Sequence, residues 1–172
     1  TALLDSVGVN LLRLAPETAT TLGLDTGDHA ELRSQLADRS AAGQQRLAEQ
    51  IRADLARVSA IDAADLTPAT QTSVEVVRSA YTTALDGFAL PYGDVAVGGW
   101  RNTPYVVIQN VGAFLDVPRF LDADHSIKTA ADAEAYLARL ESYPKQLDGE
   151  LERMKAARGL IPPGFLLDKA LK

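Results

Sequence analysis

The fold of this chain is decided by the stretch from Thr129 to Arg158, TAADAEAYLARLESYPKQLDGELERMKAAR. Its apolar side chains recur every three or four residues, a spacing that places them on one face of a helix. They are Ala133, Leu137, Leu140, Leu147, Leu151 and Met154. Thr129 and Asp132 form a capping pair at the start, whereas Pro144 cannot continue the helical hydrogen bonds. We therefore expect either a kink at Pro144 or two helices that meet there, over residues 129–143 and 144–158.

The same spacing predicts further helices on both sides of this stretch. They cover residues 2–14, 16–23, 40–58, 67–90 and 164–172. Pro16 and the pair Thr67-Pro68 are start signals, because proline in the first helical turn loses no hydrogen bond that the helix needs. Pro91 is a stop signal.

Residues 93–112 differ from the rest of the chain. Two short runs rich in β-branched residues, Val95-Ala96-Val97 and Tyr105 to Ile108, are bounded by glycine or proline, which is typical of strands or extended loops. The sequence therefore predicts a mainly α protein, a helical bundle with one short extended or hairpin segment. Residues 1–172 form a single helical region in this interpretation.

Composition excludes several classes of protein. The 172 residues carry a net charge of −6 and no basic block, which makes the chain a poor candidate for binding nucleic acid. No cysteine is present, so disulfides, thiolate zinc sites and cysteine nucleophiles are excluded. No apolar run approaches the roughly 20 residues that span a bilayer.

Candidate catalytic and metal-binding groups are few. His29 and His125 do not form the two-histidine helical zinc motif, and His125 with Asp122 and Asp124 falls short of the three or four converging ligands of a transition-metal site. Thr1 could act as an N-terminal nucleophile, but it leads into a helix rather than the strand such enzymes use. The glutamates fall mostly on polar helix faces; Glu75 lies near an apolar face. The residues themselves therefore assign no metal ligand and no catalytic residue.

The best candidate for recognition is the segment from Gly98 to Asn110. It combines planar donors, aromatic rings and amides, the groups that bind ligands through orientation-specific contacts. We expect its substrate-binding residues to be Trp100, Arg101, Asn102, Tyr105 and Gln109. The alternative is a hairpin that closes one end of the bundle, with Trp100 in the core.

Four stretches resemble a known bacterial family. They are Leu14 to Leu24 (LAPETATTLGL), Pro104 to Phe114 (PYVVIQNVGAF), Pro118 to Leu121 (PRFL) and Asp132 to Leu140 (DAEAYLARL). Their residues and their order resemble the opening part of the family called domain of unknown function 885. The resemblance covers nearly the whole chain.

This resemblance implies part of an enzyme. Proteins of that family are several hundred residues long, many carry secretion or lipoprotein signals, and their later part holds a His-Glu-Ala-x-x-Gly-His-His-type helix similar to zinc metallopeptidases. It implies a zinc-dependent peptidase or amide hydrolase whose N-terminal helices wall the substrate cleft. None of that motif is present here, so no zinc ligand and no general base can be carried over. The implied location is the periplasm or the exterior, in some members with a lipid anchor, and the cytoplasm is the alternative.

The two ends of the chain suggest a portion of a larger protein. The chain opens with Thr1 instead of methionine and closes on Lys172 after an apolar turn. We therefore expect its partner to be the remainder of the same protein, or a companion chain, that carries the zinc motif and acts with it on a peptide or amide. The alternative is a non-catalytic helical interaction or scaffold module, complete in itself and without a large apolar patch.

Overall fold

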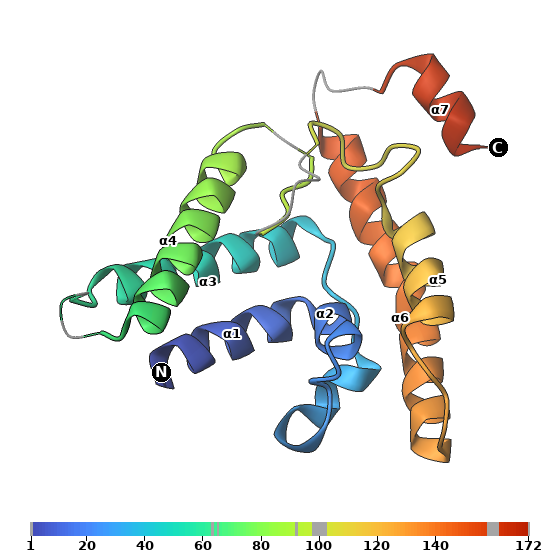
Figure 1. Cartoon of the computed structure of the whole chain (residues 1–172). Coiled ribbons are helices and arrows are strands. Elements are labelled where there is room, and N and C mark those ends of the chain that lie inside the picture. The colour runs from blue at the N-terminus through green and yellow to red at the C-terminus, as the bar shows by residue number, and fades with distance from the viewer. Residues whose placement is uncertain are drawn as a thin grey trace.

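The computed structural model describes residues 2–62, 64, 66–91, 93–97, 103–157 and 162–171. These residues form seven α-helices and one 3-10 helix, which confirms the mainly α class (Figure 1). The helices are α1 (Ala2–Leu14), α2 (Pro16–Thr21), η1 (Gly27–Ser34), α3 (Ala41–Ser59), α4 (Pro68–Phe88), α5 (Ala113–Ala123), α6 (Ala130–Ala156) and α7 (Gly164–Ala170).

Helix α6 is continuous through Pro144, so the alternative of two separate helices is wrong. Pro144 lacks the N–H that would bond the carbonyl of Leu140. Both residues are exposed, so water can solvate that carbonyl and the helix runs on. The capping pair is confirmed, because the Thr129 side chain accepts from the backbone N–H of Asp132 and the Asp132 side chain accepts from that of Thr129.

Helix α5 lies outside every predicted helix range, and it contains Pro118. It begins after Gly112, whose φ of +140° is open to glycine and strained for other residues. The first helical N–H, that of Ala113, donates to the Glu150 carboxylate on α6 at 2.8 and 3.0 Å. A contact between distant parts of the chain therefore sets the start of this helix.

The predicted extended segment forms no strand in the residues that the structure describes. It contains two isolated antiparallel bridges, Asp94 with Thr103 and Ile108 with Val111. The two β-branched runs do not pair with each other, and each bridge is too short to extend into a ladder. The segment is thus a loop held by local bridges.

Two separate clusters form the core. The larger one joins α1, α3 and α4 around the buried residues Val7, Ile51, Val58, Val74 and Tyr81. The smaller one lies between α5 and α6 and is built on Val117, Phe120 and Leu121. Figure 1 shows α1, α3 and α4 on one side, α5 and α6 on the other, and α2 with η1 below the space between them.

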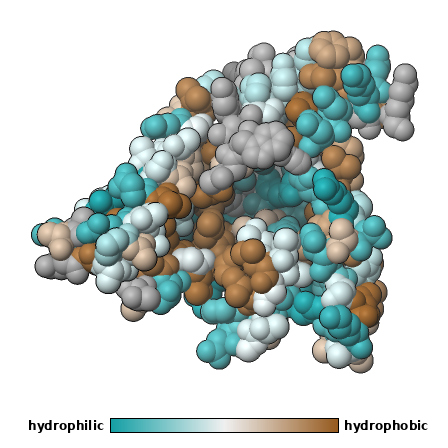
Figure 2. Space-filling model, viewed as in Figure 1, coloured by the Kyte–Doolittle hydropathy of each residue, from teal (hydrophilic) through white to brown (hydrophobic). Residues whose placement is uncertain are grey.

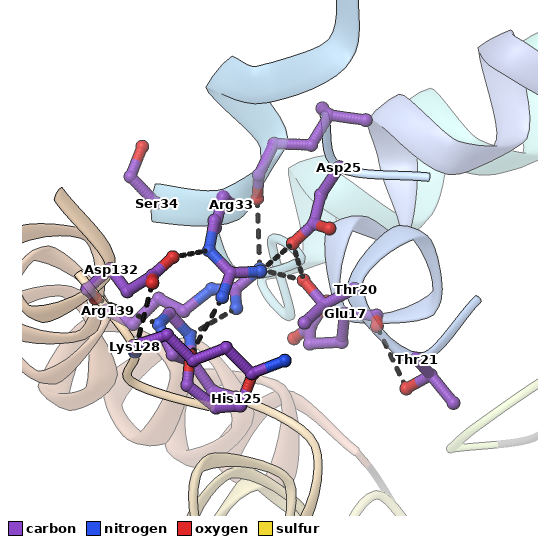
Figure 3. Close-up of polar contacts among 12 residues, drawn as sticks. Glu17, Thr20, Thr21, Asp25, Arg33, Ser34, His125, Lys128, Asp132 and Arg139 are labelled. Carbon is purple, nitrogen blue, oxygen red and sulfur yellow. Dashed lines mark hydrogen bonds and ion pairs between the residues drawn. The ribbon is translucent and has the colours of Figure 1, made fainter. Parts of the chain in front are cut away.

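A buried arginine joins α6 to α2 and η1 (Figure 3). Arg139 is fully buried and donates four hydrogen bonds of 2.7 to 3.0 Å. The acceptors are the carbonyls of Leu32 and Gln35, the Thr20 hydroxyl and Nδ1 of His125. Burial lowers the pKa of Arg139 to about 10, so the side chain is still a cation at neutral pH.

Two carboxylates, Asp25 and Asp132, are linked to this cation through intervening side chains. The Thr20 hydroxyl that accepts from Arg139 donates to Asp25 at 2.7 Å. Asp25 also pairs with Arg33 at 2.9 Å, and Arg33 pairs with Asp132 at 2.7 Å. Burial acts to raise the pKa of Asp25, but the hydrogen bonds from Thr20 and Arg33 outweigh it and hold that pKa below 3.8.

His125 is part of this network through both of its ring nitrogens. Because an arginine can only donate, Nδ1 of His125 accepts from Arg139, and Nε2 carries the proton and donates to the Asp132 carbonyl at 3.1 Å. Burial, together with the nearby Arg139 charge, lowers the pKa of His125. Both ring nitrogens are therefore occupied by structural hydrogen bonds.

Candidate functional site: a central cavity with one charged wall

A cavity of about 340 Å³ opens between the N-terminal helices and the α5–α6 pair. Its apolar side chains come from α1, α3 and the loop before residue 98: Leu11, Leu14, Leu47, Val95 and Val97. Figure 2 shows a hollow at the centre of this face, with brown apolar surface on one side and teal hydrophilic surface on the other. The cavity is thus amphipathic.

The charged side chains of the cavity come from Asp38, Arg39, Asp94, Asp116, Glu150 and Arg153, and we call them the charged wall. Arg39 is at its centre. Its guanidinium contacts the Glu150 carboxylate at 2.9 Å and the Asp116 carboxylate at 3.3 Å. Burial opposes the charge on Arg39, but Glu150 and Asp116 outweigh it and raise the pKa of the guanidinium above its usual value. Arg39 therefore stays charged, with Asp116 on the more open side, since its side chain is 33% exposed against 6% for Glu150.

Close approach of backbones places Arg39 at this position. Residues 38–40 lie against the first turn of α3 at Gly43 and against the C-terminal half of α6 at Gly149. A Cβ added to Gly43 would meet the Asp38 carbonyl oxygen at 2.0 Å, and one on Gly149 would meet the Ser40 nitrogen at 2.9 Å. Two glycines on different helices thus give the loop room to carry Arg39 into the cavity.

Arg153 links the loop at Arg39 to the loop at Gly93. It donates to the Arg39 carbonyl at 3.1 Å and to the Gly93 carbonyl. Burial lowers the pKa of Arg153, while Asp94 acts in the opposite direction. Burial also disfavours the charged form of Asp94 and so raises its pKa, whereas the charges of Arg153 and Arg39 act to lower it.

The cavity lining combines charged and apolar side chains. The cavity presents four carboxylates against two guanidiniums: Asp38, Asp94, Asp116 and Glu150 against Arg39 and Arg153. Neither histidine is among its lining residues. Among the described residues, no group of three His, Asp or Glu side chains is placed to hold a metal ion. Such a cavity suits a ligand with an apolar part and a polar or cationic part.

The predicted recognition residues are only partly described. Trp100, Arg101 and Asn102 lie outside the described residues. Tyr105 lines a different, apolar pocket of about 170 Å³, beside Met154 of α6 and Leu167 of α7. The side-chain oxygen of Gln109 is buried and accepts no hydrogen bond from the described part of the chain. All five assignments to substrate binding therefore stay predictions.

Sequence reasoning missed the charged wall. Arg39, Asp116 and Glu150 lie far apart in the chain, and no motif links them. Glu150 was expected on a solvated helix face but is buried at 4% exposure, whereas the Glu75 side chain, expected near the core, is 75% exposed. The spacing of charged residues along a helix does not show which of them are buried, because that depends on the elements that pack against the polar face of the helix.

The fold and the cavity together define a mainly helical module with a central cavity. The family described as "Bacterial protein of unknown function (DUF885)" matches residues 16–172. This chain belongs to that family.

The chain is similar in fold to one part of a longer protein of known structure. That protein is the putative lipoprotein from Colwellia psychrerythraea, with a TM-score of 0.79 and 22% sequence identity. The match covers 99% of this chain and 29% of that chain, so this chain spans less than a third of the relative. No curated protein matches. No helix among the described residues is both long and apolar enough to cross a membrane.

Proposed function

We propose that this chain is the N-terminal helical portion of a zinc-dependent hydrolase that acts on a peptide or another amide. In this proposal the central cavity forms one wall of the substrate cleft. The zinc-binding motif lies in sequence outside these 172 residues or on a companion chain, since the described residues do not fit a zinc site. This chain binds and orients the substrate, and the zinc supplies the activated water.

The observation that carries the proposal is the cavity with its prearranged charges. Peptides combine apolar side chains with polar amides and charged ends, which match a wall of leucines facing carboxylates and guanidiniums. Its described lining contains no histidine, and the Asp116 and Glu150 carboxylates are paired with Arg39, an arrangement that favours binding and orienting a polar ligand.

A location outside the cytoplasm belongs to the same proposal. The Colwellia relative is named as a lipoprotein. We propose a periplasmic or secreted protein, with a lipid anchor in the complete polypeptide.

The first experiment is an intact mass on native material, under native and denaturing conditions. We expect a polypeptide much longer than this chain, or a companion chain, that contains zinc by elemental analysis. Purified material should then cleave members of a mixture of peptides, followed by mass spectrometry. A lone monomeric chain of 18.4 kDa would overturn the proposal and favour the scaffold module.

The second experiment tests the cavity in the active protein. Asp116→Asn keeps the shape of the side chain but removes its charge, so we expect KM to rise several-fold with kcat nearly unchanged. Asp86→Asn is the matched control, because Asp86 is exposed on α4 and does not line the cavity. Substitution of Trp100, Arg101, Asn102, Tyr105 or Gln109 is also expected to raise KM more than it changes stability. Equal KM values for the Asp116 and Asp86 variants would show that the cavity does not contact the substrate.

A further inference from the structure

One face of α6 carries a row of exposed apolar side chains. Leu137 is 57% exposed, Leu140 40%, Leu147 36% and Leu151 46%. Steps of three and four residues put them on one face, together with the exposed Pro144. We call these five residues the leucine face. It extends roughly 20 Å along the helix, and a continuous exposed apolar row of this length marks an interaction surface.

An acidic row borders the leucine face. Glu134, Glu141 and Asp148 are exposed and follow one another at intervals of seven residues, so they lie along one edge. An antiparallel second copy would place Glu141 opposite Asp148 of that copy, where like charges repel, and Glu134 opposite the exposed Lys155, where opposite charges attract, so this edge gives a second copy no net gain. The net charge of −6 disfavours both a second copy and an anionic lipid surface. The charges therefore fit an apolar partner edged by lysine or arginine.

We propose that the leucine face packs against the part of the longer protein that lies outside these 172 residues, through an apolar surface bordered by basic side chains. This inference rests on the proposed function, in which the chain is one portion of a larger protein. It is supported by the Colwellia relative, in which the same fold accounts for 29% of the chain. The buried side of α6, with Arg139 and Glu150, already packs within this module, which leaves the leucine face for the remainder.

Site-specific cross-linking tests the contact. A photoreactive phenylalanine derivative replaces Leu140 or Leu147 in the intact protein, and Val76 on α4, which is 61% exposed, serves as the control position. We expect cross-links from positions 140 and 147 to an apolar segment outside residues 1–172 that has lysine or arginine beside it. Cross-links to the α6 of a second copy, to a different protein, or in no greater yield than from position 76 would each overturn the inference.

Charged substitutions give a second readout. In the intact protein, the double change Leu140→Glu and Leu147→Glu should speed hydrogen exchange of the cross-linked segment ~100-fold, because each leucine buried at an interface contributes about tenfold or more. The same change should leave the melting temperature of this 172-residue chain unchanged, since both side chains are exposed there. Unchanged exchange in a longer, zinc-containing protein would overturn this inference alone, whereas an intact mass of 18.4 kDa without a companion would overturn it together with the proposed function.

Discussion

At the scale of single residues, Arg139 shows how a buried charge stabilises this fold. Among the described residues it contacts no carboxylate directly, and all four of its hydrogen bonds go to neutral acceptors. Its planar guanidinium donates hydrogen bonds to acceptors on α2, on η1 and in the turn before α6 at the same time. The compact ammonium of lysine cannot reach all of them. The sequence places Arg139 on a helix but does not indicate that its surroundings are closed.

We predict that Arg139→Met lowers the free energy of unfolding by about 3 kcal/mol or more. Methionine fills part of the space but leaves the Thr20 hydroxyl, two carbonyls and His125 Nδ1 without their donor, and each buried group left unpaired costs about 1–3 kcal/mol. Urea unfolding followed by circular dichroism measures the change. Arg119→Met on the exposed side of α5 is the control and should stay within about 0.5 kcal/mol of the wild type.

His125 makes the stability of the fold depend on pH. Its pKa in the folded chain is below the ordinary 6.5, because burial and Arg139 disfavour the imidazolium. In the interval between the two pKa values the unfolded chain binds more protons, so stability rises with pH. The contribution is therefore complete above pH 6.5 and is lost as pH falls through the folded-state pKa, where a protonated Nδ1 would face Arg139.

We predict that the urea concentration at the unfolding midpoint of the wild type decreases as the pH is lowered from 7.5 to 5. His125→Gln should show a smaller fall over the same interval, because the titrating group is gone while a polar side chain remains. Arg33, Arg139 and the Asp132 carboxylate face the ring but are not expected to change charge in this interval, and the pKa of Asp132 is held at about 2. An equal fall in both proteins would assign the effect to another group.

At the scale of secondary structure elements, close backbone contacts decide which helices meet. Periodicity and capping residues predicted the positions of α1, α3, α4 and α7 to within a few residues. They did not predict α5, which depends on Glu150, or the continuity of α6 through Pro144. For α5 the deciding group is Glu150, which is remote in sequence. For α6 it is the solvent around the exposed Leu140 carbonyl.

Two glycine-to-alanine changes separate helix propensity from packing. Gly8→Ala on α1 should raise the free energy of unfolding by about 0.5–1 kcal/mol, since a Cβ there meets nothing within 4 Å. Gly149→Ala should lower it by about 1 kcal/mol or more, because overpacking against the backbone of residues 39 and 40 outweighs the gain in propensity. Thermal and urea unfolding of the two variants measure both signs. Equal stabilisation by both changes would contradict the close approach of α6 to that loop.

At the scale of the whole molecule, two apolar clusters are joined by charged and polar groups. The clusters lie on opposite sides of the cavity, and Arg39, Glu150 and Arg139 connect the N-terminal half to α6. This arrangement leaves an amphipathic hollow inside and the leucine face outside. The cavity is the physical basis of the proposed function, and the exposed apolar row on α6 is the physical basis of the proposed contact.

The sequence by itself determined the helical class, most helix limits, the capping of α6 and the family, because these depend on local spacing, end signals and residue order. Only the tertiary structure decided which charged side chains are buried and where the cavity lies. Arg39, Asp116 and Glu150 come together from positions 77 and 111 residues apart, and their pairing depends on backbone approaches at Gly43 and Gly149. Local patterns report which face of a helix is apolar, whereas burial of a charge is set by the partners that the complete fold brings to it.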